Sequence, residues 1–399
     1  MKRWFCAWAL VLTAQSAYAL DEIAPAYLQL LQKIVDINSD SHNVDGLANV
    51  GNTLIPYFEA LGLQVTHHPL ADGREVLRFE TANAKPTVLL VGHLDTVFSP
   101  SSPFQSIRRE GDRLMGPGVI DMKGGVVLML NALEHLKSVG QLDNIRVVLN
   151  DDEEIGSSQS KSVLQQLAQG IPYGLVFEPG LEDGAVVSSQ SGVRWIKLTT
   201  FGKAAHAGLE PENGIDACLD LATKITKLAA LAEPEKGLLI NPGVIEGGSK
   251  PNVVCEKASV TVDVRFQDVS DWERVAAAME TIRGHSDVYN KKLQQGTRTE
   301  LVQLAEMPLL PDSNTHTLVV QAQEVAQSLG QSFKARGVGY GSDGNNLASQ
   351  NISILVGLGP YGGGMHSDKE FMQLSSYGDR LALVTALIEK LNPPERKLP

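Results

Sequence analysis

The stretch "IRVVLNDDEEIGSS", residues 145–158, joins an apolar run directly to four consecutive carboxylates. Its first five residues have the length and branched composition of a strand that is buried on both faces. The acids at 151–154 repel one another, at a cost of about 4 kcal/mol for each pair 4 Å apart in a medium of intermediate dielectric. A solvated surface loop is one explanation for such a run. The other is a group of cations bound where the strand ends.

The composition is that of an ordinary globular protein. The chain has 399 residues, of which 43% are hydrophobic, enough for two domains and at least one large core. Its formal charge of −12 argues against nucleic acid and anionic membrane surfaces as partners. We therefore expect no nucleic-acid partner and no membrane partner.

The N-terminus has the pattern of a secretory signal. Residues 1–3 are "MKR", residues 4–17 are largely apolar, and Ala17-Tyr18-Ala19 is an A-x-A site. This pattern predicts a signal peptide over residues 1–19, cleaved near Ala19-Leu20, and a periplasmic or secreted protein. An N-terminal membrane anchor is the alternative, although the apolar segment is short for a span.

Cleavage at that site also removes Cys6 and leaves two cysteines, Cys218 and Cys255. Two cysteines do not make a disulfide framework, but an oxidising compartment permits one bridge. The sequence leaves open whether the two lie within bonding reach.

Two kinds of pattern alternate along the chain. Helical spacing alternates with apolar strands up to about residue 190, which indicates a layered α/β fold with a mainly parallel sheet. Between residues 191 and 306 the strands alternate apolar and polar side chains, as in "KASVTVDVRF". From residue 307 the first pattern resumes. We expect a discontinuous larger domain, residues 20–190 and 307–399, interrupted by a small α+β domain, residues 191–306.

Acids and histidines recur where apolar strands end. In open α/β sheets, functional side chains gather just past the carboxyl ends of the strands. A single strand-end histidine is more often structural, but five such positions together predict a metal centre. These positions are His93, Asp121, Glu154, Glu178 and His366.

Imidazole and carboxylate together suit zinc and related divalent ions. Five side-chain ligands are more than one catalytic zinc with an open position uses, whereas a bridging Asp121 lets two ions each take one histidine and one glutamate. Asp95 is two residues from His93, so on an extended backbone it points the same way and can orient the imidazole. Of the adjacent Glu153 and Glu154, one can ligate while the other acts as general base. Asp151 and Asp152 remain helpers or surface charges.

Eight stretches between Gly92 and Glu370 resemble metallopeptidase family 20, the dizinc hydrolases that include aminoacylases, tripeptidase-type peptidases and glutamate carboxypeptidase. "EP" after a strand and the closing "HSD" most resemble the glutamate carboxypeptidase branch. The stretches are "GHLDTV", "GPGVIDMKGG", "DDEEIGS", "FEPG", "GKAAHAGLEPENGIDA", "PNVVCEKASVTVDVR", "GYGSDGNNL" and "MHSDKE".

The resemblance implies a phosphorylase/hydrolase-like catalytic domain with a mainly parallel mixed sheet, and an inserted ferredoxin-like lid through which the chain forms a homodimer. It implies two Zn²⁺ per subunit, for which Co²⁺ or Mn²⁺ can substitute. Glu153 matches the general base, and a cis peptide is expected at Asp121-Met122. One zinc would be held by His93, Asp121 and Glu178, and the other by Glu154, Asp121 and His366.

The resemblance also assigns roles around the substrate. His206 matches a lid histidine that reaches the partner's active site in dimers and stabilises the oxyanion. Asn252 and Arg265 match positions that bind the substrate, notably its carboxylate. Gly341 and Ser342 match a loop on the substrate side. Two alternatives stay open, a plain surface histidine at His206 and a structural ion pair at Arg265.

The sequence departs from its relatives in two places. Cys255 stands where many relatives have proline, and neither residues 180–187 nor residues 301–311 contain a basic residue of the kind that glutamate-selective relatives use. The second departure weakens glutamate preference and leaves exopeptidase chemistry intact.

The expected function is a zinc-dependent metallo-exopeptidase of the glutamate carboxypeptidase type, cleaving the amide before a C-terminal amino acid in a small peptide or N-acyl amino acid. An N-acyl amino acid deacylase or a dipeptidase would use the same machinery. The alternatives without catalysis are a periplasmic solute-binding protein and a metal-binding scaffold that has lost activity.

Overall fold

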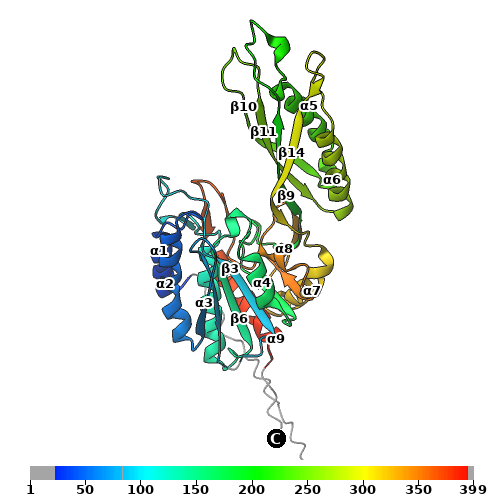
Figure 1. Cartoon of the computed structure of the whole chain (residues 1–399). Coiled ribbons are helices and arrows are strands. Elements are labelled where there is room, and N and C mark those ends of the chain that lie inside the picture. The colour runs from blue at the N-terminus through cyan, green and yellow to red at the C-terminus, as the bar shows by residue number, and fades with distance from the viewer. Residues whose placement is uncertain (1–22, 83, 394–399) are drawn as a thin grey trace, which may run out of the picture.

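The computed structural model describes residues 23–82 and 84–393, so the expected signal peptide at residues 1–19 lies outside the described chain. The described residues form two lobes (Figure 1). The larger lobe contains the first and the last described elements, and the middle of the chain forms the smaller lobe. Long strands connect the two.

The larger lobe is built on a six-stranded sheet in the order β1-β2-β6-β3-β7-β16. β6, β3, β7 and β16 are parallel to one another, and the β1–β2 hairpin joins β6 in antiparallel orientation. The expected mainly parallel mixed sheet is therefore confirmed. The strands are β1 (Gln64–Pro69), β2 (Glu75–Glu80), β3 (Val88–His93), β6 (Ile145–Asn150), β7 (Tyr173–Val176) and β16 (Ser353–Leu355).

Helices cover both faces of this sheet because its central strands are apolar on both sides. Along β3, Val88 and Leu90 pack into one hydrophobic cluster, whereas Leu89 and Val91 pack into another, as the alternation of side chains along a strand requires. The first cluster includes α1 (Pro25–Val35), α2 (Val44–Ala60), α3 (Lys123–Ser138), α7 (Asp312–Ser328) and α9 (Ser376–Leu391). The second includes α4 (Lys161–Ala168) and α8 (Asp343–Leu347).

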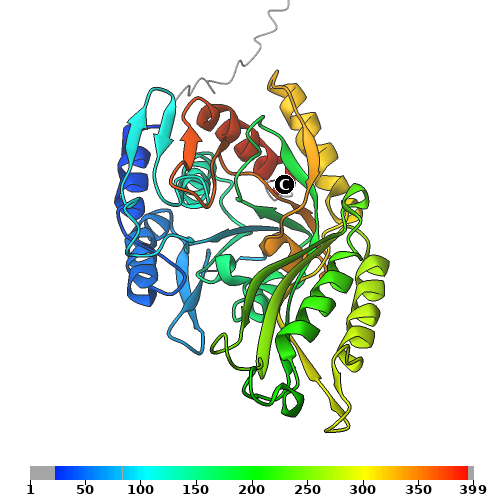
Figure 2. The ribbon, with the colours of Figure 1, turned by 90° about the horizontal axis from the view of Figure 1, so that it is seen from above.

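In the view from above, the blue helices α1 and α2 lie at the outer edge of the larger lobe (Figure 2). Among the described residues, no helix is both long and apolar enough to cross a membrane.

Smaller sheets hold the loops around the carboxyl ends of the main strands. The order β17-β18-β5-β4 places β18 beside β5, so the loop between β17 and β18 lies close to the chain that follows β5. The remaining pairs are β8 with β15 and β12 with β13. The strands are β4 (Arg108–Glu110), β5 (Arg113–Met115), β8 (Val186–Gln190), β12 (Tyr289–Asn290), β13 (Gln295–Gly296), β15 (Ala335–Val338), β17 (Gly362–Gly363) and β18 (Phe371–Gln373).

The smaller lobe, called the lid below, is an antiparallel sheet in the order β10-β11-β9-β14. The element order β9-α5-β10-β11-α6-β14 is the β–α–β–β–α–β arrangement of ferredoxin-like units. One face, which includes Ile196 and Leu198, packs under the two helices in a separate hydrophobic cluster, and Trp195 and Lys197 alternate with it on the open face. The elements are β9 (Gly192–Phe201), α5 (Ala217–Ala229), β10 (Leu239–Gly247), β11 (Lys257–Phe266), α6 (Val269–Gly284) and β14 (Arg298–Met307).

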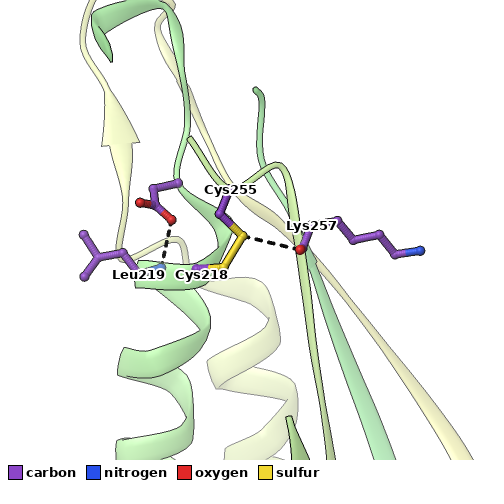
Figure 3. Close-up of a disulfide and its surroundings, with 5 residues drawn as sticks. Cys218, Leu219, Cys255 and Lys257 are labelled. Carbon is purple, nitrogen blue, oxygen red and sulfur yellow. Dashed lines mark hydrogen bonds between the residues drawn. A yellow bond between two sulfur atoms is a disulfide. The ribbon is translucent and has the colours of Figure 1, made fainter. Parts of the chain in front are cut away.

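A disulfide joins two segments of the lid. Cys218 in the first turn of α5 is bonded to Cys255, just before β11, with the two Cα atoms 5.6 Å apart (Figure 3). The carbonyl of Cys255 also accepts the N–H of Ala217 at 2.8 Å. The bridge that the sequence left open is thus present, and it closes a loop of 37 residues.

We expect the double variant Cys218→Ala/Cys255→Ala to unfold more easily than the wild type. Loss of a crosslink over a loop of this size removes about 4 kcal/mol in the chain-entropy description. Guanidinium unfolding followed by circular dichroism measures the difference. A reductant should destabilise the wild type and leave the double variant unchanged; equal sensitivity of the two proteins would contradict the prediction.

Candidate metal centre and active-site cavity

Asp95 connects the end of β3 to the acidic segment after β6. β3 and β6 are parallel neighbours in which His93 is paired with Asn150, so the chain segments that follow them lie side by side. The buried carboxylate of Asp95 accepts the N–H of Glu153 at 3.1 Å and that of Glu154 at 3.0 Å. It also lies 3.3 Å from Nδ1 of His93, which makes a shorter contact of 3.0 Å with the backbone carbonyl of Asp95. One carboxylate therefore orients a histidine and two glutamates.

A second buried carboxylate holds the turn that carries Asp121. Oε1 of Glu370 accepts the N–H of Ile120 at 3.0 Å and that of Asp121 at 3.3 Å. The Asp121-Met122 peptide is cis, so this expectation is confirmed. Sequence reasoning assigned Glu370 no role, although it closes the quoted stretch "MHSDKE".

The structure brings all five expected ligands together around Asp121. Nε2 of His93 lies 3.4 Å from Oδ1 of Asp121 and 3.7 Å from Oε1 of Glu178. Nε2 of His366 lies 3.2 Å from Oδ2 of Asp121 and 3.1 Å from Oε2 of Glu154. The two oxygens of Asp121 thus face different histidines, as a bridging carboxylate would.

These spacings fit divalent cations. Ligands of a tetrahedral zinc, each about 2.0–2.1 Å from the ion, lie about 3.3 Å from one another. Nε2 of His93 is buried and has no hydrogen-bond partner among the described residues, so it is available as a ligand. Side-chain nitrogen and oxygen atoms of His93, Glu153 and Glu178 also lie within 4.8 Å of one another, as do those of His93, Asp121 and Glu154. We assign the ligand sets from the shorter contacts, which leave Glu153 beside the cluster.

Burial and the close approach of the acids shift the pKa values of the cluster residues. Burial, followed by repulsion from Asp121, raises the pKa of Glu154 to about 7. Burial also raises the pKa of Glu178 to about 7, although the nearby His93 opposes this shift. Burial and then Glu178 raise the pKa of Glu153 well above its usual range. Hydrogen bonds to Asp121 and Glu154 raise the pKa of His366 to about 10.

Asp151 and Asp152 are helpers rather than surface charges, because both are buried. The carboxylate of Asp151 accepts the N–H of Glu75 at 2.9 Å. That of Asp152 accepts the N–H groups of Gln159 at 2.9 Å and Ser160 at 3.2 Å. These bonds fold the segment after Glu154 back against the sheet.

A cavity of about 370 Å³ opens next to the cluster, between the larger lobe and the end of the lid sheet where β9 begins and β14 ends. Of the expected substrate-binding residues, Arg265 and Gly341 line it. Nε of Arg265 bonds to Asp263 at 2.8 Å, so the ion pair left open by the sequence exists, and Nη1 donates to the carbonyl of Gly339 at 3.0 Å. Tyr340, which sequence reasoning missed, lines the cavity with a buried hydroxyl that has no partner among the described residues.

Three other expected site residues lie away from the described lining of this cavity. Ser342 is buried, its hydroxyl donates to Gln190 at 2.9 Å, and it caps α8. His206 is exposed on the lid, where its Nδ1 accepts the N–H groups of Gly208 and Leu209. The carbonyl of Asn252 accepts the N–H of the residue after His206 at 3.0 Å.

Comparison with known proteins identifies the family. The sequence profile of "Peptidase family M20/M25/M40" matches residues 89–390. The chain belongs to this family. It is 30% identical over 388 residues to carboxypeptidase G2 of Pseudomonas sp. (strain RS-16), covering 94% of this chain and 91% of that relative. The predicted resemblance is therefore confirmed, and the protein is a metallopeptidase or amidohydrolase rather than a solute-binding protein.

Solved structures show the same fold. A tripeptidase of Staphylococcus aureus matches 93% of the chain and 99% of its own length with a TM-score of 0.75 at 21% identity. An M20 family metallo-carboxypeptidase of Sulfolobus solfataricus matches 92% of the chain and all of its own length with a TM-score of 0.74 at 17% identity. The α/β fold with an added lobe is thus that of M20 peptidases.

We expect Asp95→Asn to lower zinc affinity by roughly 10- to 100-fold, because the amide cannot accept both N–H bonds and loses its charge beside His93. Competition with a chromophoric chelator measures the affinity. Asp268→Asn is the matched control, since Asp268 caps α6 on the exposed lid and asparagine caps equally well. Unchanged affinity in Asp95→Asn would contradict the proposed role of this carboxylate.

Proposed function

We propose that this M20 family member is a zinc-dependent exopeptidase of the glutamate carboxypeptidase type, which hydrolyses the amide bond before a C-terminal amino acid. The observation that carries the proposal is the pair of histidine–carboxylate sets that share Asp121, with Glu153 beside them at the cavity. The identity to carboxypeptidase G2 over nearly the whole chain supports it. An N-acyl amino acid deacylase or a dipeptidase would use the same residues.

Two zinc ions fit the residues present. His93, Asp121 and Glu178 would hold one ion, and Glu154, Asp121 and His366 the other. When bound, such a pair supplies Lewis acidity that polarises a scissile carbonyl and lowers the pKa of a water. Cobalt or manganese ions suit the same nitrogen and oxygen ligands.

Side chains of the protein would bind the substrate and transfer the proton. Arg265 would bind the terminal carboxylate of the substrate, for which a planar guanidinium is well shaped. Glu153 would accept a proton from the attacking water and deliver it to the nitrogen of the leaving amino acid. The carboxylate of Asp95 accepts the backbone N–H of Glu153, which holds Glu153 in place, and it also orients the imidazole of His93.

His206 fits a role in a second subunit. β9 begins at the cavity and runs for ten residues, which extend about 30 Å, before the chain reaches His206. Its Nδ1 accepts backbone N–H groups, so the neutral ring carries its proton on Nε2, where it can donate to an oxyanion. We therefore propose a homodimer formed through a lid domain of residues 191–306, in which each His206 completes the partner's site and Asn252 supports it.

We also propose that the protein is exported, with cleavage near Ala19-Leu20 and a location in the periplasm or outside the cell. The Cys218–Cys255 disulfide supports this location, because such bonds persist in oxidising compartments.

We expect Glu153→Gln to lower kcat by roughly 10²- to 10⁴-fold while zinc content is unchanged, because the amide cannot carry the proton. Release of free amino acid from N-acyl amino acids and small peptides measures turnover, and the best substrate separates carboxypeptidase, deacylase and dipeptidase. Glu59→Gln, on the exposed face of α2, is the control. Equal rates in wild type and Glu153→Gln would show that Glu153 is not the base.

We expect His206→Ala and Glu153→Gln, each nearly inactive alone, to regain activity when the two are mixed under conditions that allow subunits to exchange. The mixed dimer has one site with an intact Glu153 and an intact His206 from the other subunit. Turnover of the mixture, compared with the two separate variants, is the measurement. If mixing restores nothing although the dimers exchange, His206 does not act across subunits.

A further inference from the structure

We infer that the cavity selects substrates whose C-terminal residue has an apolar side chain. The inference rests on the proposed exopeptidase function and adds the class of residue that it releases. Beyond the metal cluster, the described lining is largely apolar and comes from both lobes. Its apolar side chains include Val193, Trp195, Ala305, Met307, Tyr340 and Met365. Outside the metal cluster and Glu153, its charged side chains are Arg265 and Glu306.

The part of this wall that the lid supplies is continuous. Val193 is paired with Met307, and Trp195 with Ala305, in the antiparallel register of β9 and β14, so the four side chains stand on the same open face of the sheet. Met307 extends to the larger lobe, because a Cβ on Gly341 would lie only 2.7 Å from its Sδ. Gly341 thus allows the lid strand and the substrate-side loop to meet without a gap.

The positive charge at this wall is sufficient for one substrate carboxylate only. Arg265 is the single lysine or arginine among the described residues that line the cavity. It is already bonded to Asp263 and to a backbone carbonyl, which leaves one edge of the guanidinium for the terminal carboxylate of the substrate. Within this chain, a glutamate side chain would bring a second carboxylate beside that of Glu306, and the described lining holds no further lysine or arginine to receive it.

Two other cations, neither of them in the described lining, pair with the carboxylate of Glu306, which itself lines the cavity. Nζ of Lys161 lies 3.3 Å from Glu306, and Nε of Arg194 lies 3.7 Å from the same carboxylate. Arg194 also donates to the carbonyls of Val193 and Met307 and lies over the rings of Phe266 and Trp272. Its guanidinium therefore sits on the helix-covered side of the lid sheet, away from the cavity.

Transfer of an apolar side chain from water into such a pocket favours binding. Transfer of an unpaired carboxylate opposes binding, because the carboxylate loses its hydration. A cavity of about 370 Å³ is at the small end of the range for ligand sites, which suits one amino-acid residue beside the metal cluster. Leucine, methionine and phenylalanine are the residues that this wall fits.

The experiment measures kcat/KM of the zinc-loaded full chain for N-benzoylglycyl dipeptides that end in leucine, methionine, phenylalanine, glutamate or lysine. We expect the apolar residues to be preferred over glutamate by roughly 10- to 100-fold. A preference for glutamate or lysine would overturn the inference and leave the exopeptidase proposal standing. Absence of hydrolysis for every dipeptide would overturn the proposed function, and the inference with it.

A matched pair of variants tests whether the wall causes the preference. Met307→Lys places a cation in the wall and should raise kcat/KM for the glutamate substrate relative to leucine by about tenfold or more. Leu304→Lys adds the same charge to the same strand at an exposed position outside the described lining, and should leave the ratio unchanged. If the ratio of kcat/KM for glutamate to that for leucine were the same in both variants, the claim that this wall sets the preference would be overturned.

Binding gives a readout without turnover. Calorimetric titration of zinc-loaded Glu153→Gln with free leucine and free glutamate should show tighter binding of leucine, and Met307→Lys in that background should reverse the order. Tighter binding of glutamate by the unmodified wall would contradict the inference even if a variant fails to fold.

Discussion

The carboxylate of Asp95 accepts the backbone N–H groups of Glu153 and Glu154, and the arrangement of the site depends on these two hydrogen bonds. They tie the segment after β6 to the chain just past β3, and the same carboxylate lies against Nδ1 of His93. A buried carboxylate is costly unless it is hydrogen-bonded, and here two backbone N–H groups and the hydroxyl of Ser41, at 2.7 Å, supply that bonding. One group thereby fixes the relative positions of His93 and Glu154, which we propose as metal ligands, and of Glu153, which we propose as the general base.

Repulsion among the acids is the second constraint. Burial and mutual repulsion raise the pKa of Glu154 and of Glu178 to about 7, and bound cations would relieve this repulsion. The four consecutive acids at residues 151–154 avoid mutual repulsion because they point to different places. Asp151 and Asp152 turn inward and accept backbone N–H groups, whereas the two glutamates face the metal cluster and cavity.

The sequence was most informative where side-chain type and strand ends coincide. Apolar runs that end in His93, Asn150 and Phe177 predict parallel strands, and parallel strands bring the residues after them to one edge, so the clustering of the five expected ligands could be predicted. Contacts between distant segments could not be predicted from the sequence pattern. The hydrogen bond from the turn at Asp121 to Glu370, for example, joins residues about 250 positions apart. Ser342 was expected beside substrate, but it lies inward as the N-cap of α8, where its hydroxyl accepts the N–H of Gly344.

The most direct test of the two-metal account is a crystal structure of the zinc-loaded chain with anomalous scattering measured at the zinc edge. The account predicts two peaks on opposite sides of Asp121, one bonded to Nε2 of His93 and the other to Nε2 of His366. No peak at either histidine, or a single peak that leaves Asp121 bound on one side only at saturating zinc, would contradict it.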